Sequence, residues 1–296
     1  MPEYPRLLGP RNCDIHDRWR GLHTRLPLLR SRHPENSASA KSQRAERIGR
    51  SGRPHGRQPC GFTVVNRDDL PDGGADHYRK CIEAVRERSP DVGLELLCSD
   101  LDGNLDALAH LLVDLPLRVF AHNVECVPRL DSVVRDPRAS FEQSLEILRE
   151  AKRLRPDLVI KSSIMVGVGE TDEEVVEAMH LLRQAGVELI TLGQYLQPSW
   201  KHLAIDRFPE PSTFAAWDQA AREMGYKAVA SGPLVRSSYR AGLLWEEAMG
   251  GEPVVTRDST GSAISHLNPS KELLTSKSKS LLATNEARLS SEHQTI

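Results

Sequence analysis

The chain has 296 residues, of which 39% are hydrophobic, 27% charged and 5% aromatic, and its formal net charge is −2. No apolar run approaches the roughly 18 residues of a transmembrane helix, and no apolar secretory core follows the first residues. The five cysteines are odd in number and widely spread, which disfavours a disulfide framework and favours a reducing, cytoplasmic location.

Charge is divided unevenly along the chain. Residues 1–60 contain 13 Lys and Arg against 5 Asp and Glu, residues 61–250 contain 21 against 31, and residues 251–296 contain 5 against 5. Too few apolar residues cluster in the basic segment to offset the entropy of ordering it. We therefore predict a disordered basic arm over 1–61, one domain over 62–249 and a disordered Ser/Thr-rich tail over 250–296. Nucleic-acid binding by the arm is disfavoured because no aromatic or helical pattern accompanies its charge.

From residue 62 onward, short apolar runs alternate with amphipathic segments. Thr171 with Glu174 fits a capping box at a helix start, and Gly186 fits the end of that helix. The alternation predicts crossover units and a parallel α/β sheet, with a full or partial barrel favoured over an open doubly wound sheet because no dinucleotide-binding glycine pattern is present. The predicted strands are 62–66, 93–98, 117–122, 158–165, 188–192 and 227–230, and the predicted helices are 75–88, 104–112, 140–154, 173–185 and 212–224.

Polar residues close four of the predicted strands. In a parallel barrel these strand ends meet at one mouth, where functional residues collect. A carboxylate, an imidazole, a lysine and several amides there predict a site for a polar cofactor, although each residue alone could be an ordinary loop residue or cap. The four stretches are 122–125 (HNVE), 161–171 (KSSIMVGVGET), 193–198 (GQYLQP) and 231–233 (SGP).

A second candidate site is the acidic stretch that contains Asp68, Asp69 and Asp72. Three carboxylates close together suit Mg²⁺ or Ca²⁺, but their spacing does not match an EF-hand loop. A polar turn after a strand is the better interpretation of this stretch.

Five motifs resemble those of the lipoyl synthases in the radical S-adenosylmethionine (SAM) superfamily, over about residues 62–249. They are 66–75 (NRDDLPDGGA), 122–130 (HNVECVPRL), 161–171 (KSSIMVGVGET), 193–198 (GQYLQP) and 236–241 (RSSYRA), in the family's order. The resemblance implies a partial (β/α)6 TIM-type barrel. It also implies a sulfurtransferase of lipoate biosynthesis that inserts two sulfur atoms into protein-bound octanoyl-lysine by radical chemistry.

The resemblance also implies cofactors and partners. The family uses SAM and two [4Fe–4S] clusters, one that cleaves SAM and one that is consumed as the sulfur source. Its partners are octanoylated lipoyl-domain proteins and an electron donor such as ferredoxin or flavodoxin, with neither a membrane nor nucleic acid involved. Ser237 matches the serine that ligates the sulfur-donor cluster, with Ser238 as the other choice. The candidate cofactor-binding residues are His122, Asn123, Glu125, Lys161, Gly167, Gly169, Glu170, Gln194, Gln197 and Arg236. Among them, Arg236 is expected at the cluster or the substrate, and Lys161 either binds a carboxylate or snorkels from the barrel.

The sequence departs from the family at its cluster ligands. The family has one Cys-x3-Cys-x2-Cys and one Cys-x4-Cys-x5-Cys motif, whereas no two of these five cysteines are closer than 17 residues. Three closely spaced thiolates are needed to hold each cluster. We therefore expect that this chain binds neither cluster, and the alternative to an active enzyme is a cluster-free, inactive remnant. Cys81, Cys98 and Cys126 are interpreted as packing residues.

The N-terminal segment also lacks a recognisable first barrel strand. Codons permitted for residues 11–17, read one nucleotide later, allow the family's first-strand sequence Gly-Thr-Ala-Thr-Phe-Met-Ile. The same shift over residues 22–30 allows its cluster loop, Cys-Thr-Arg-x-Cys-x-Phe-Cys. This agreement leads to the hypothesis that residues up to about 61 are a frame-shifted translation, which sequencing of the gene decides.

Overall fold

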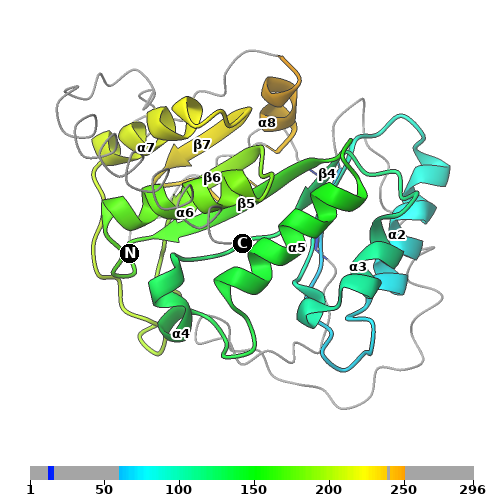
Figure 1. The fold of residues 1–296 in the computed structure, drawn as a ribbon, viewed down its shortest axis with the longest axis horizontal. Coiled ribbons are helices and arrows are strands. Elements are labelled where there is room, and N and C mark those ends of the chain that lie inside the picture. The colour runs from blue at the N-terminus through cyan, green and yellow to red at the C-terminus, as the bar shows by residue number, and fades with distance from the viewer. Residues whose placement is uncertain (1–12, 17–59, 239–240, 251–296) are drawn as a thin grey trace, which may run out of the picture.

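The computed structural model describes residues 13–16, 60–238 and 241–250, in which seven parallel strands form one sheet in the order β1 to β7 (Figure 1). Sequential order with parallel pairing requires a crossover between each pair of neighbouring strands, as in a TIM-type barrel. Because β1 and β7 are the two edges of the described sheet, the barrel is partial, which confirms the predicted fold class. The strands are β1 (Cys13–His16), β2 (Cys60–Thr63), β3 (Leu94–Leu97), β4 (Val119–Ala121), β5 (Val159–Val166), β6 (Leu189–Gln194) and β7 (Ala228–Gly232).

Helices follow the strands and pack against the sheet and one another (Figure 1). All five predicted helices are confirmed, and the one predicted over 75–88 has the predicted bounds. No helix in the described part of the chain is long and apolar enough to cross a membrane. The α-helices are α2 (Ala75–Arg88), α3 (Leu105–Leu112), α4 (Asp131–Val134), α5 (Phe141–Leu154), α6 (Asp172–Gln184), α7 (Pro211–Glu223) and α8 (Ala241–Ala248), and two 3-10 turns are η1 (Leu101–Gly103) and η2 (Pro128–Leu130).

Local sequence signals explain where these helices begin and end. The Thr171 hydroxyl accepts from the Glu174 N–H while the Glu174 carboxylate accepts from the Thr171 N–H, so the predicted capping box is present at α6. Gly186 follows this helix with a φ of 88°, a conformation that favours glycine. Ser140 caps α5 by accepting from the Gln143 N–H.

The strands bury side chains on both faces, as parallel sheets do. Residues of one face, such as Leu96, Phe120 and Ile190, belong to the large apolar cluster shared with the helices. Residues of the other face, such as Val159 and Leu189, form a second cluster with Leu244 of α8. Two apolar clusters on opposite faces fix the strand register, since a slip of one residue would exchange them.

The structure corrects the expectation that no first strand precedes residue 62. Strand β1 pairs in parallel with β2, with Cys13 opposite Cys60 and His16 opposite Thr63. Its four residues alternate apolar and polar within an otherwise polar segment, which is too short a pattern to indicate a strand. The other residues of the predicted arm and the tail beyond Gly250 lie outside the described residues, so the predicted domain boundaries stay predictions. Helices α4 and α8 were not predicted.

Candidate functional site

A cavity of about 550 Å³ opens at the carboxyl ends of the strands and has a mainly apolar lining with a few polar groups. The carboxyl ends of β2 to β7, or the loops that follow them, all contribute to it, as the barrel topology predicts for a functional site. Six of the predicted site residues line this one cavity: His122, Asn123, Glu125, Gln194, Arg236 and Ser237.

Asn123 and Glu125 follow β4 and are half-buried in the cavity wall. The Asn123 amide donates to Glu125 Oε1 at 3.1 Å, which orients the carboxylate. Burial raises the pKa of Glu125, with the Asn123 hydrogen bond and the Arg135 charge opposing that rise. The Glu125 backbone has a φ of 67°, a strained conformation for a residue with a side chain, and it bridges to Ile164 of β5.

Both ring nitrogens of His122 contact protein groups. Nδ1 lies 3.0 Å from the Cys98 carbonyl oxygen and Nε2 lies 2.9 Å from Ser144 Oγ, which also accepts from Arg135 at 2.9 Å. The carbonyl contact requires a proton on Nδ1, so a neutral ring accepts from Ser144 at Nε2. Burial lowers the pKa of His122, which favours this neutral form. His122 therefore positions the end of β4, with neither nitrogen left for a ligand in this arrangement.

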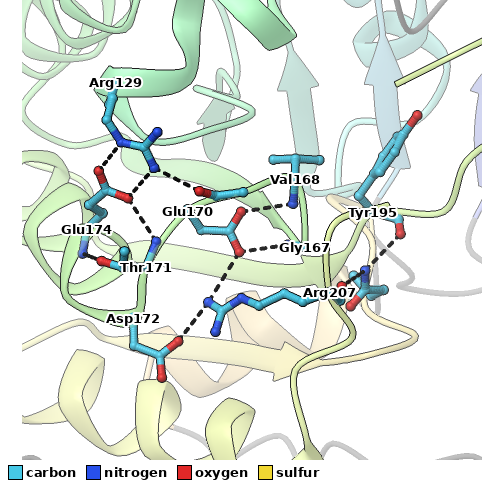
Figure 2. A network of polar contacts seen from close by, with 11 residues as sticks. Arg129, Gly167, Val168, Glu170, Thr171, Asp172, Glu174, Tyr195 and Arg207 are labelled. Carbon is cyan, nitrogen blue, oxygen red and sulfur yellow. Dashed lines mark hydrogen bonds and ion pairs between the residues drawn. The ribbon is translucent and has the colours of Figure 1, made fainter. Parts of the chain in front are cut away.

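The loop after β5 is held together by the buried Glu170 carboxylate (Figure 2). Its two oxygens accept from the N–H groups of Gly167 at 2.7 Å and Val168 at 3.0 Å. Arg207, in the loop after β6, lies 3.4 Å from Glu170 and donates to Asp172 at 2.7 Å. Glu170 thus ties the β5 and β6 loops together beside the cavity.

Glycine is required at one position of this loop. Gly167 has a φ of 93°, and a Cβ there would lie 2.3 Å from the Gln194 amide nitrogen and 2.5 Å from the Arg207 carbonyl oxygen. The Gln194 amide donates to that same carbonyl at 3.2 Å. Gly169 also has a positive φ, of 112°, but nothing lies within 4 Å of its Cβ position. Gly167 therefore permits close contact between two loops, whereas Gly169 serves the turn alone.

The loops after β6 and β7 complete the cavity. Arg236 donates to the carbonyl oxygen of Val235 at 2.6 Å, and burial lowers its pKa. Ser237 lies beside it in the lining. Gln197, by contrast, donates to the His202 carbonyl at 2.9 Å and stabilises its own loop. The cavity lining therefore includes Gln194, Arg236 and Ser237 but not Gln197.

Lys161 lies deeper in the barrel than the sequence suggested. Its Nζ is 2.6 Å from Glu95 Oε1, and its side chain is 2% exposed. This ion pair links β5 to β3 across the barrel interior. Like Gly167, Gly169, Glu170 and Gln197, Lys161 does not belong to the cavity lining.

Sequence reasoning missed Arg135 and Ser144. Arg135 is buried in the cavity wall, and Ser144 is a fully buried residue of α5 that contacts both His122 and Arg135. Arg135 follows a helix of four residues, which is too short to show a periodic pattern in the sequence. The one available signal was the cluster of charged residues around Pro137, in the stretch 134–138 (VRDPR). Ser144 lies on the apolar, buried face of the amphipathic helix α5. Because a buried hydroxyl needs a hydrogen-bond partner, a serine at such a position indicates a polar contact in the core.

The acidic stretch after β2 has its carboxylates engaged in local contacts. Asp72 accepts from the N–H groups of Gly74 and Asp76 at the start of α2. Asp69 pairs with Arg67, and Asp68 pairs with Arg138 at 2.7 Å. These contacts fit the polar-turn interpretation.

Cysteines are buried where their side chains are described. Cys81, Cys98 and Cys126 lie in the apolar core, and Cys98 also reaches the cavity lining. Burial raises the pKa of Cys98 and of Cys126 to about 12, so both are thiols at neutral pH. Within residues 60–238 and the other described segments, no three His, Cys, Asp or Glu side chains come together as a metal site. The described residues thus give Ser237 no thiolate partners with which to hold a cluster.

Sequence comparison assigns the class of protein. The family model described as Radical SAM superfamily matches residues 30–182, which is about half of the chain. The crystal structure of methylornithine synthase (PylB) has a TM-score of 0.58 at 11% identity, covering 88% of this chain and 77% of that one, and so shares the fold. The chain belongs to the radical SAM superfamily.

Within that superfamily, the chain resembles lipoyl synthases. It is 49% identical over 216 residues to the lipoyl synthase of Halorhodospira halophila, covering 73% of this chain and 64% of that protein. It is 49% identical over 181 residues to the human mitochondrial lipoyl synthase, covering 61% and 48%. The chain spans about half to two-thirds of the length of these curated relatives.

Proposed function

We propose that this chain is a lipoyl synthase-like sulfurtransferase whose cavity binds SAM at the carboxyl ends of the strands. The cavity residues would hold SAM, and the bound SAM would supply the radical chemistry by which two sulfur atoms are inserted into an octanoyl chain on a lipoyl-domain protein. A ferredoxin or flavodoxin would supply electrons. The reducing cytoplasm is the location that fits the cysteine usage.

The observation that carries this proposal is the convergence of three family-like motifs on one cavity. HNVE after β4, GQYLQP at the end of β6 and RSS after β7 each contribute to its lining, although they are far apart in the sequence. A cavity of about 550 Å³ with apolar walls and a few fixed polar groups suits a nucleoside-sized ligand. Its donors and acceptors fit the polar groups of SAM.

Individual residues have distinct tasks in this proposal. The Glu125 carboxylate, oriented by Asn123, accepts from an ammonium group or from ribose hydroxyls. His122, Gly167, Glu170 and Gln194 hold the loops around the ligand, and Lys161 stabilises the barrel beneath it. Arg236 would donate to the ligand or to a cluster, and Ser237 is the position that would offer its hydroxyl to the sulfur-donor cluster.

The ligand-binding half of the proposal is tested with S-adenosylhomocysteine and the full chain. We expect Glu125→Gln to weaken binding roughly tenfold or more, because a hydrogen bond to a charged group is worth about 1.5–3 kcal/mol. Isothermal titration calorimetry measures the effect. Glu142→Gln is the matched control, since this exposed residue of α5 lies outside the cavity lining and, among the described residues, forms an ion pair with Arg149 alone. Equal affinity of the Glu125 variant and the wild type would contradict the assigned role.

The alternative function is a cluster-free remnant, favoured by the spacing of the cysteines. Anaerobic reconstitution with iron and sulfide, followed by measurement of bound iron and visible absorption, distinguishes the active enzyme from the cluster-free remnant. An active enzyme needs about eight irons for two [4Fe–4S] clusters. Because the thiolate triads are absent, we expect close to none. A full complement of iron would contradict the remnant.

A further inference from the structure

The loops after β6 and β7 carry exposed apolar side chains beside the cavity. Leu196 lines the cavity and is 49% exposed, and Leu234 is 50% exposed next to the lining residue Val235. Trp200 is 83% exposed and Phe208 is 65% exposed, and both belong to the loop between β6 and α7. In the described part of the chain, no other Phe or Trp side chain is exposed. Single exposed apolar residues are common, but several of them around the mouth of a cavity indicate an interaction surface.

Trp200 lies close to this mouth. Pro198 lines the cavity, and two residues of chain span at most about 7 Å, so the Cα atoms of Pro198 and Trp200 are within that distance. The Nζ atom of Lys201 is 5.1 Å from the centre of the Trp200 ring, which is a cation–π contact. The loop therefore presents an aromatic surface and a positive charge side by side.

Hydrogen bonds fix the turn that carries Trp200. The His202 N–H donates to the Ser199 carbonyl at 3.0 Å, and Ser199 Oγ lies 2.8 Å from His202 Nδ1. The Gln197 amide donates to the His202 carbonyl at 2.9 Å. A turn that is already ordered loses little entropy when a partner binds, and tryptophan is among the residues most enriched at the energetic centres of protein interfaces.

The proposed substrate brings a folded protein to this rim. Its octanoyl chain is attached to a lysine of a lipoyl-domain protein. When the chain enters the cavity, the body of that protein is drawn against the loops around the mouth, because the acyl-lysine arm is short compared with a folded domain. The apolar surface at Trp200 is continuous with the cavity through Leu196 and Pro198.

We propose that Trp200 and Lys201 form a docking site for the folded body of the octanoylated lipoyl-domain protein, separate from the cavity that receives the acyl chain. This inference rests on the proposed function. The Trp200 ring would be buried against an apolar part of the partner's surface, and Lys201 would pair with carboxylates at its edge. The site thus fits a partner surface that is apolar at its centre and acidic at its rim.

The test compares two ligands that share the acyl chain but differ in the protein. One is an octanoylated lipoyl domain, and the other is Nα-acetyl-Nε-octanoyl-lysine amide. We expect Trp200→Ser in the full chain to weaken binding of the domain roughly ten- to thirtyfold and of the amide less than about twofold, because only the domain reaches the loop. Isothermal titration calorimetry measures both. If the amide binds too weakly to measure, the unacylated domain replaces it, and its affinity should fall by the same factor as that of the acylated domain.

Lys201→Gln tests the charged part of the site. It should weaken binding of the domain about two- to fivefold at low salt, and this loss should shrink as salt is added, since the charge is exposed.

Val113→Ser is the matched control for an exposed apolar side chain. Val113 is 44% exposed and ends α3, which returns to the amino end of β4 and so away from the mouth. This variant should leave the affinity for the domain unchanged. Thermal unfolding of each variant shows that it is folded.

Selective loss of domain binding in Trp200→Ser supports the docking site. Equal loss of the domain and the amide, or no loss of either, overturns it and leaves the proposed function standing. A change in the sedimentation of the chain alone on Trp200→Ser would assign the surface to a second copy of this chain, which also overturns it. Failure of the wild-type chain to bind either the domain or the amide would contradict the proposed function together with this inference.

Discussion

Replacing Lys161 with Met is expected to destabilise the chain by about 3–5 kcal/mol, because it leaves the Glu95 carboxylate buried without its partner. The pair is 2.6 Å apart and Lys161 is 2% exposed, so water cannot take the place of the ammonium group. Urea unfolding at pH 7, followed by circular dichroism, measures the free energy of unfolding.

The double variant Lys161→Met with Glu95→Leu should recover most of this loss, since an apolar pair of similar volume is often as stable as a buried ion pair. Lys152→Met is the matched control. Its partner Glu188 also pairs with Lys227, and we expect a loss below about 1 kcal/mol for this partly exposed pair. If the single and double Lys161 variants were equally destabilised, the buried charge would not be the cause.

The second large effect is expected at Gly167. Gly167→Ala should cost about 1–3 kcal/mol from backbone strain and a similar amount, about 1–3 kcal/mol, from contact with a neighbouring loop. The new Cβ would lie 2.5 Å from the Arg207 carbonyl oxygen, which belongs to the backbone and cannot rotate away. Binding of S-adenosylhomocysteine should weaken as well, because Gln194 would be displaced from the cavity wall.

Gly169→Ala separates strain from crowding. Its φ is also positive, but its Cβ would meet nothing within 4 Å, so only the strain of about 1–3 kcal/mol is expected. Thermal and urea unfolding of both variants provide the comparison. If Gly167→Ala and Gly169→Ala lowered the free energy of unfolding equally, the close contact between the loops would not contribute to the effect at Gly167.

The regular elements were predictable because their signals are local. The helix over 75–88 has the predicted bounds, and the Thr171 capping box is present. Strand β1 escaped prediction because a four-residue alternation in a polar segment carries too little periodicity.

The site was predictable as a region but not residue by residue. The polar residues at the ends of the predicted strands correctly indicated a site at the mouth of the barrel, and six of the predicted residues line the cavity there. The sequence does not show how deep a side chain lies along a strand, so Lys161 was expected near the mouth and instead pairs with Glu95 below it. Arg135 was missed because its position depends on a loop whose path is set by Asp131 of α4, which accepts from the Phe141 N–H at the start of α5.

The contacts around Glu170 affect how the mouth of the barrel moves. Arg129 donates to the Gly169 carbonyl and pairs with Glu174, so the β4 loop joins the two loops that Glu170 already connects (Figure 2). Three segments from distant parts of the chain are thereby ordered before any ligand arrives. A ligand entering there has less conformational entropy to remove, which leaves more of its contact energy for affinity.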